Sequence, residues 1–293
     1  MKNFKFLLLP FLLLAFAACD KDDDSDNEPE EQMSFKFKFD PNQERLGKFG
    51  EPESIPPENA AQSPRFNGMS AHYVELAPDK FTMVGEGVVL YKAPETSKGG
   101  DNAIDFDKAV VKKNGETFLT VPLSDIPPGT YKYLRVSLGY QNFDIDFNAV
   151  GNSFTGTLAS FVGFETYITS FEVDEKTHTV NANKKQGYWA FETHNVPAPY
   201  DKIIDDQAPG TTVVNPINST SPIPPGSCLV TGTFDPPLEI TGEESGVEVT
   251  VSLSTNKSFE WKDENGNGEY DVDQEEQVVD MGLRGLKAFA TKK

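Results

Sequence analysis

The amino-acid sequence predicts an all-β protein, most simply a β-sandwich, and three observations lead to this prediction. Apolar and polar residues alternate in short runs, which contain many of the 22 Phe and 9 Tyr of this 293-residue chain. Alternation with a period of two is typical of strands that bury one face. Turn-forming Pro and Gly separate the runs, and no window keeps a helical period over three turns.

The first 18 residues predict a secretory signal peptide. They have a basic start, an apolar run from Phe6 and small residues before Cys19, and the apolar run is too short to span a bilayer. The ending Phe16-Ala17-Ala18-Cys19 resembles a bacterial lipobox, although Phe16 stands where an aliphatic residue is usual. The resemblance implies cleavage before Cys19 and acylation of its sulfur and amine, so that the acyl chains hold the protein on a lipid bilayer. Ordinary cleavage that leaves a free Cys19 is the alternative.

Residues 19–33 predict an acidic, disordered tether, because a block of like charges cannot bury apolar surface. Lys21-Asp22-Asp23, shortly after Cys19, resembles the surface-export signal of Bacteroidota lipoproteins. This resemblance implies a lipid-anchored protein of the outer membrane that is exposed on the cell surface. The periplasmic face is the alternative location.

The charge balance excludes one class of partner. The formal net charge is −20, and removal of a leader that carries Lys2 and Lys5 but no acid takes it to −22. Such a field repels nucleic acid and attracts divalent cations, so we expect no nucleic-acid binding. With Cys19 acylated, Cys228 is the remaining thiol and no intrachain disulfide can form. The apolar run that Cys228 opens predicts a buried, inert strand cysteine.

The expected strands begin at residues 34–39, where Phe35, Phe37 and Phe39 share one face. Asn114-Gly115 predicts a type I′ hairpin turn between strands 105–111 and 116–121. The other expected strands are 71–76, 87–91, 132–138, 143–147, 153–158, 165–173, 178–182, 187–192, 228–234, 238–241, 248–254, 258–261 and 278–286. Strands of this kind pack as a sandwich, of the immunoglobulin-like or transthyretin-like type.

Two long Pro-rich stretches interrupt the strands. Residues 40–68 predict an ordered loop, and residues 195–226 carry seven prolines. A loop of this length is usually functional or a domain junction. Ile-Pro-Pro-Gly occurs at 126–129 and again at 223–226, which fits either two related halves or one turn type used twice. We therefore predict one β-sandwich region over 34–290, or two subdomains divided near 150 or within 195–226.

Residues 261–280 form the stretch whose spacing predicts specific chemistry. Calcium binds six to eight oxygen ligands, and glycine permits the sharp turn inside such a loop. With Asp263 as position 1, Gly268 is position 6, but position 12 is Gln274, and the flanks are strand-like rather than helical as in an EF-hand. We expect a structural Ca²⁺ with ligands drawn from Asp263, Asn265, Asn267, Glu269, Asp271, Glu275 and Glu276. The alternative is an Asn-Gly turn with solvated acids.

The sequence also resembles two known groups of proteins, one at this loop and one over other parts of the chain. The loop resembles the calcium loops of Gram-positive surface adhesin B-repeats, which implies the metal rather than a shared fold. The matching positions are Trp261, Asp263, Asn265, Gly268 and Asp271. The run over residues 40–76 and the terminal residues 280–286 are similar to an uncharacterised Bacteroidota lipoprotein family, and the likeness spans most of the mature chain. It implies localisation and fold but no activity.

Weaker candidates for chemistry are two carboxylate pairs and three histidines. Asp105/Asp107 and Asp144/Asp146 have i, i+2 spacing, so each pair would share one strand face, as the carboxylates of a glycosidase could. Solvated faces of amphipathic strands explain the same pattern. The histidines fall in no nucleophile or zinc motif, and they are His72, His178 and His194.

Three aromatic residues near the second Pro-rich stretch predict a weak ligand-binding platform. Tyr188, Trp189 and Tyr200 could stack on a sugar ring, although alternation places Tyr188 and Trp189 on opposite faces.

The anchor, the β-sandwich and the long loops predict a surface-anchored lipoprotein with a ligand-binding or structural role. Its partner would be a glycan, a peptide or a neighbouring outer-membrane protein. The alternative function is a glycoside hydrolase that uses paired Asp/Glu carboxylates from separate strands. Five Met and three His argue against a copper-handling protein, and we expect no catalytic residue set.

Overall fold

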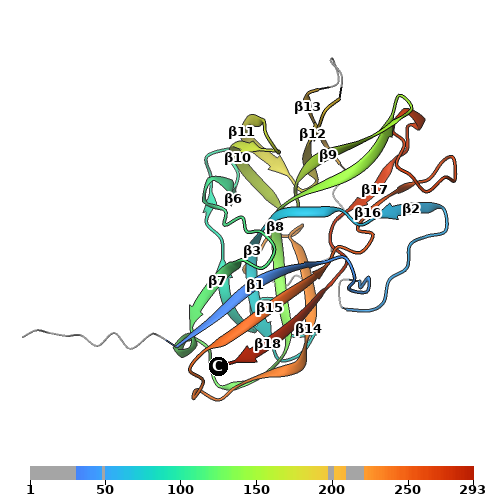
Figure 1. Ribbon diagram of the computed structural model, residues 1–293. Helices are drawn as coiled ribbons and strands as arrows, with labels where there is room; N and C mark the ends of the chain where they lie inside the picture. Colours follow the sequence, from blue (N-terminus) through green and yellow to red (C-terminus); the bar gives the residue numbers. More distant parts are fainter. Residues whose placement is uncertain (1–30, 48–49, 197–200, 209–220) are drawn as a thin grey trace, which may run out of the picture. The chain divides into compact units, whose positions relative to one another are not determined.

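The prediction of an all-β chain is confirmed by the computed structural model, which describes residues 31–47, 50–196, 201–208 and 221–293 (Figure 1). The strands are β1 (Gln32–Asp40), β2 (Asn59–Gln62), β3 (Arg65–Ala77), β4 (Val88–Lys92), β5 (Glu95–Thr96), β6 (Ala103–Asp105), β7 (Thr117–Pro122), β8 (Gly129–Ala149), β9 (Asn152–Phe161), β10 (Glu165–Glu172), β11 (Thr177–Lys185), β12 (Tyr188–Thr193), β13 (Ile203–Gln207), β14 (Cys228–Ile240), β15 (Val247–Ser254), β16 (Phe259–Lys262), β17 (Val278–Met281) and β18 (Leu286–Lys292). The helical segments of the described residues are short 3₁₀ turns, η1 (Phe106–Lys108), η2 (Leu123–Asp125) and η3 (Val272–Gln274). None of these segments has the length and apolarity needed to cross a membrane.

The main sheet is organised around β8, a strand of 21 residues. Its strand order is β13-β12-β9-β8-β14-β18-β15-β1-β7, and β3 pairs with the other edge of β8 and with β4. The first half of β8 pairs with β14 and the second half with β9, so two strands share one of its edges. Residues 65–77 of β3 pair along the opposite edge, with register shifts between Phe66 and Gly68 and around Ala71.

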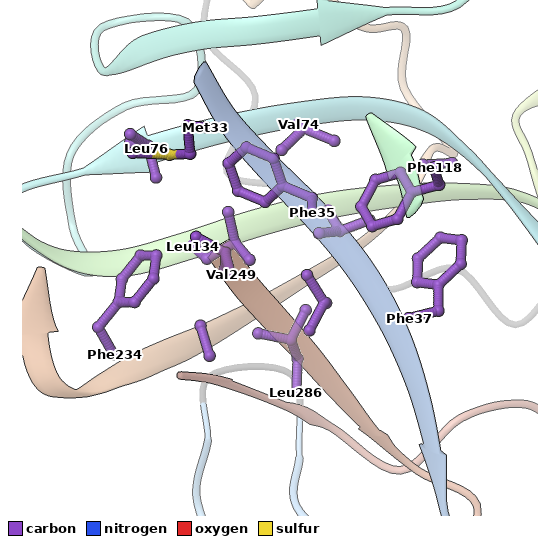
Figure 2. Packing of buried hydrophobic residues seen from close by; sticks show 14 of the residues in the cluster. Met33, Phe35, Phe37, Val74, Leu76, Phe118, Leu134, Phe234, Val249 and Leu286 are labelled. Atoms are coloured by element: carbon purple, nitrogen blue, oxygen red, sulfur yellow. The ribbon is translucent and has the colours of Figure 1, made fainter. Parts of the chain in front are cut away.

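The sheet folds over at the β14–β18 pair, which consists of only two register positions. At this corner a Cβ on Gly232 would lie 2.2 Å from the carbonyl oxygen of Leu286, so only glycine permits the approach. Strands β1, β15 and β18 then lie over β3, β8 and β14, and their inward side chains fill one core (Figure 2). This is the sandwich that the alternation predicts.

Strand β1 supplies the aromatic centre of this core. Met33, Phe35 and Phe37 are fully buried, and the ring of Phe37 stacks on Phe118 with centroids 3.9 Å apart. The alternation predicted from the sequence is confirmed here. Strand β1 lies between β7, antiparallel, and β15, parallel, with eight paired positions along β15.

The second half of β8 and its neighbours β9 and β12 bury both faces. One face packs under the small sheet β11-β10-β6-β5 around Tyr140, Phe161 and Phe171. The other face, with Phe143 and Phe147, packs against the small sheet β17-β16-β2. Residues 31–293 thus form one compact unit with several cores arranged along one strand.

One strand prediction and one hairpin prediction were wrong around residue 110. The expected strand 105–111 is not formed. The observed strand β6 ends at Asp105, and the 3₁₀ turn η1 follows it. Asn114-Gly115 does turn, but its flanks do not pair with each other: β7 pairs with β1, and Lys112 bridges to Met69. The Asn114 Oδ1 instead accepts the N–H of Phe39 at 2.8 Å. A partner from the amino-terminal strand therefore replaces the local hairpin partner.

Other boundaries were also wrong. The separate strands 132–138 and 143–147 are one strand, β8, and the strands 228–234 and 238–241 are one strand, β14. The expected last strand 278–286 is divided between β17 and β18, which belong to different sheets. The loop 40–68 contains β2 and the start of β3, the stretch 195–226 contains β13, and β1 begins inside the expected tether.

Truncation of Phe37 tests the importance of the β1 core. We expect Phe37→Ala to lower the free energy of unfolding by about 3–5 kcal/mol, because it leaves a cavity where a buried ring stacked on Phe118. The matched control is Phe289→Ala in β18, whose side chain is exposed, and its effect should stay within about 0.5 kcal/mol. Denaturant unfolding measures the free energy of unfolding of both variants. Equal decreases in the two would contradict the central place of Phe37 in this core.

Candidate functional site

The predicted calcium loop connects β16 to β17, and Asp263 organises its first half. The carboxylate of Asp263 accepts the N–H of Gly266 at 2.9 Å and the N–H of Gly268 at 3.0 Å. Both glycines have positive φ, of 72° and 77°, a conformation that favours glycine over residues with a Cβ. The two glycines of the motif are thus explained by the turn that wraps around one carboxylate.

Two side chains of the loop converge on one oxygen atom of a third, Asp271. The Nδ2 atoms of Asn265 and Asn267 both donate to Oδ2 of Asp271, each at 2.7 Å. Asn148 of β8 donates from Nδ2 to the other oxygen of Asp271 at 3.0 Å. These hydrogen bonds lower the pKa of the Asp271 carboxyl, and the bond from Asn265 has the largest effect. Positions 3, 5 and 9 of the loop therefore face a common centre.

The structure distinguishes the two candidate glutamates that follow. Glu276 is buried, and its oxygens accept the N–H of Asp271 at 2.7 Å and the N–H of Glu264 at 3.2 Å. Glu275 is exposed and has a left-handed backbone with φ of 56°. Glu276 therefore closes the loop, while Glu275 forms the turn that leads into it. Glu269 is exposed and accepts Asn148 Nδ2 at 2.6 Å.

The loop is attached to the end of β8. The carbonyl of Tyr270 accepts the N–H of Asn148 at 2.8 Å, and Asn148 forms a parallel bridge with Asp271. The ring of Tyr270 packs on Trp261, which is buried, and on Phe259. Burial and the nearby Glu276 carboxylate raise the pKa of Tyr270 to about 12. Trp261, the aromatic residue of the loop motif, thus anchors the loop in the core between β8 and β16.

Sequence reasoning missed Asn148. This residue lies 123 positions from Asp271 in the chain, and nothing in its local pattern separates it from other polar strand residues. Only the pairing of β8 with the loop brings it to the site.

Within the described residues, no group of three or more His, Cys, Asp or Glu side chains lies close enough to hold a metal ion. The convergence at this loop includes two asparagines, and its carboxylates bond to backbone N–H groups and amides.

The first carboxylate pair does not share a strand face. Asp105 is the last residue of β6 and is buried, with Lys108 3.1 Å away, whereas Asp107 lies in η1 and accepts the hydroxyl of Thr169. The prediction of one common face was wrong for this pair, because the strand stops between its two members.

The second pair lies in β8, and each member already has a partner. Arg65 donates to both oxygens of Asp146, at 2.9 and 3.1 Å, and lowers the pKa of this carboxyl. A glycosidase general acid requires the opposite shift. Asp144 accepts the hydroxyl of Thr157 at 2.7 Å and Nδ2 of Asn67 at 2.8 Å.

His194 extends this network without forming a nucleophilic site. Its Nε2 lies 2.8 Å from Oγ1 of Thr157, and its Nδ1 lies 3.4 Å from Asp174. The order hydroxyl, imidazole, carboxylate is that of a catalytic triad. However, Thr157 is 1% exposed and donates its proton to Asp144, so no substrate reaches this hydroxyl. The arrangement ties β9, β12 and the turn after β10 together.

The other two histidines also connect elements. His72 is fully buried, and its Nε2 lies 3.1 Å from Oε1 of Glu95. His178 lies 3.1 Å from the hydroxyl of Tyr188. The hydrogen bond with His72, supported by Asn102 and Lys92, lowers the pKa of Glu95 to about 2.

Two residues of the expected aromatic platform, Tyr188 and Trp189, do not lie together. Tyr188 is buried in the β10–β11 core, while Trp189 packs against the opposite core with Phe191. The strand alternation places these rings on different faces of β12, as the sequence indicated. Tyr200, like Cys19, lies outside the described residues. Cys228 begins β14, and burial raises the pKa of its thiol to about 12.

Comparison of the chain with protein-family models, curated proteins and solved structures finds no match. The Bacteroidota family and the adhesin-like calcium loop therefore stay predictions from the sequence.

Glu95 gives a prediction for acid stability. Its pKa is about 2 in the folded chain against an ordinary 4.5, so its stabilising contribution is present above pH 4.5 and is lost as the pH falls toward 2. We expect Glu95→Gln to be less stable than the unmodified chain at neutral pH and to approach it in acid. Urea unfolding at several pH values measures the difference in free energy of unfolding between the two proteins. Glu86 is exposed, so Glu86→Gln is the control and should be as stable as the unmodified chain at every pH. If the loss of stability in Glu95→Gln persisted in acid, the low pKa of Glu95 would be contradicted.

Proposed function

We propose that this chain is a surface-anchored lipoprotein with a ligand-binding or structural role, stabilised by calcium bound to the loop between β16 and β17. The observation that carries the calcium proposal is the convergence of Asn265 and Asn267 on the Oδ2 atom of Asp271, at 2.7 Å each. The side chains at positions 3, 5 and 9 of the loop thus meet at one centre. To bind calcium there, the amide groups of Asn265 and Asn267 would turn their oxygens toward it, which now accept the N–H groups of Asn267 and Glu269.

The charge of the loop supports the same proposal. Residues 263–276 carry seven carboxylates and no basic residue, and like charges at this density repel one another. A divalent cation would offset that repulsion. Asp263, Asn265, Asn267, Asp271 and Glu276 are the residues that would hold it, through carboxylate and amide oxygens. The ion would fix the loop against β8 and so support β17 and the sheet that it forms with β16 and β2.

The two adjacent glutamates provide the test of this site. We expect added Ca²⁺ to raise the melting temperature of the metal-free protein and EDTA to reverse the rise. Glu276→Gln should abolish most of the response, because Glu276 closes the loop from a buried position. Glu275→Gln is the matched control and should keep the response, because Glu275 is exposed and forms the turn.

Asp263→Ala is a second variant of the same loop, since its carboxylate accepts two glycine N–H groups. A response to Ca²⁺ that is unchanged in both Asp263→Ala and Glu276→Gln would rule out this loop as the calcium site.

The membrane anchor is proposed from Cys19 and the acidic residues that follow it. Several acyl chains bind a bilayer durably, whereas a single chain binds it reversibly. We expect Cys19→Ala to abolish incorporation of labelled fatty acid and to move the protein from the membrane fraction to the soluble fraction. Cys228→Ala is the control and should change neither result. Fatty-acid incorporation that persists in Cys19→Ala would contradict the anchor.

The ligand-binding role is preferred to the glycoside hydrolase. Arg65 holds Asp146 ionised, and Asp144 is occupied by Thr157 and Asn67. These contacts favour a structural role for the pair on β8. Among the described residues, burial raises the pKa of one carboxyl group, Asp280, and this group is bound to Arg284 at 2.6 Å.

A further inference from the structure

A pocket of about 550 Å³ opens where β10 begins and β11 and β13 end, beside the turn before β14. Its volume is within the range of about 300–1,000 Å³ that is common for small-molecule sites. The residues that line it are Phe164, Glu165, Lys185, Gln186, Gln207, Ala208 and Gly226. None of the expected site residues belongs to this set.

Two glutamine side chains have fixed orientations in this pocket. Gln186 donates from Nε2 to the carbonyl of Val162 at 2.9 Å. Gln207 donates from Nε2 to the carbonyls of Gln186 at 2.7 Å and Ala208 at 3.0 Å. Because both amide nitrogens are engaged, the Oε1 atoms are the groups left to accept hydrogen bonds. Neither Oε1 has a donor within the described part of the chain.

The charged residues of the pocket are similarly open to a ligand. Glu165 and Lys185 are opposite each other in the β10–β11 register, yet no ion pair joins them and neither has a polar partner among the described residues. Phe164 gives the pocket an apolar wall, and its ring contacts that of His72, with ring centroids 5.5 Å apart. His72 is itself buried, so the wall is supported from within the fold.

We propose that this pocket binds a polyhydroxylated small molecule such as a sugar ring, an inference that rests on the ligand-binding role proposed above. The pocket offers three acceptor groups, the two amide oxygens and the Glu165 carboxylate, against one cationic donor, Lys185. A ligand with several hydroxyl groups would satisfy this set, because each hydroxyl can donate to an acceptor oxygen and can also accept a hydrogen bond from Lys185. An aromatic face such as that of Phe164 packs on the apolar C–H face of a sugar ring. The chain's charge of −20 and the Glu165 carboxylate disfavour an anionic ligand.

Ligand-detected NMR on the calcium-loaded protein, with glucose, galactose, mannose and N-acetylglucosamine as separate probes, tests the proposal. We expect saturation transfer to at least one of these sugars. Titration calorimetry with that sugar should show binding weakened about tenfold or more in Gln207→Leu, which removes one fixed acceptor. Phe164→Ala should weaken binding similarly. Gln207 is exposed, so its variant should keep the melting temperature of the unmodified protein.

The control is Phe289→Ala, an exposed aromatic residue in a second hollow formed by β1 and β18, and it should leave sugar binding unchanged. Absence of saturation transfer to every probe would overturn the pocket while leaving the calcium and anchor tests standing. Sugar binding that is as strong in Gln207→Leu and Phe164→Ala as in the unmodified protein would also contradict this pocket as the site. That result would support a ligand-binding role at another site.

Discussion

The structure depends on the need of one long strand for hydrogen-bond partners along both edges. No neighbour of β8 is as long as its 21 residues. On one edge β14 and β9 follow each other, and on the opposite edge β3 ends its pairing at Asp144. Beyond that point Asn148 pairs with the loop at Tyr270 and Asp271. The candidate calcium loop therefore also completes the edge of the central strand.

A buried charge network holds the first Pro-rich stretch in place. Glu260 of β16 lies 2.9 Å from Arg45 and 3.4 Å from Arg284, and it accepts Nδ2 of Asn59 at 2.6 Å. Arg284 also contacts Asp280. Removal of one member of such a network leaves an uncompensated buried charge, which typically costs about 3–5 kcal/mol. The network thus ties the described part of this stretch, at Arg45 and Asn59, to β16.

The sequence predicted those features that a local pattern determines. The Phe alternation of β1 and the Asp-Gly spacing of residues 263–268 correspond to a buried strand face and to a turn around one carboxylate. Features decided by distant partners escaped prediction. The Asn114 turn bonds to Phe39 rather than closing a hairpin, Asn148 joins the loop across 123 positions, and the pocket at Gln186 and Gln207 is assembled from four separate segments.

Strand β1 would also have a mechanical consequence if the chain is anchored at Cys19 as proposed. The chain before Gln32 leads directly into β1, and β1 lies between two neighbours, with eight paired positions along β15 that begin at Met33. A pull along the strand axis would load these hydrogen bonds together in shear, instead of opening them one after another. The strand that would continue the proposed tether is thus the one whose extraction would disrupt the core around Phe35 and Phe37.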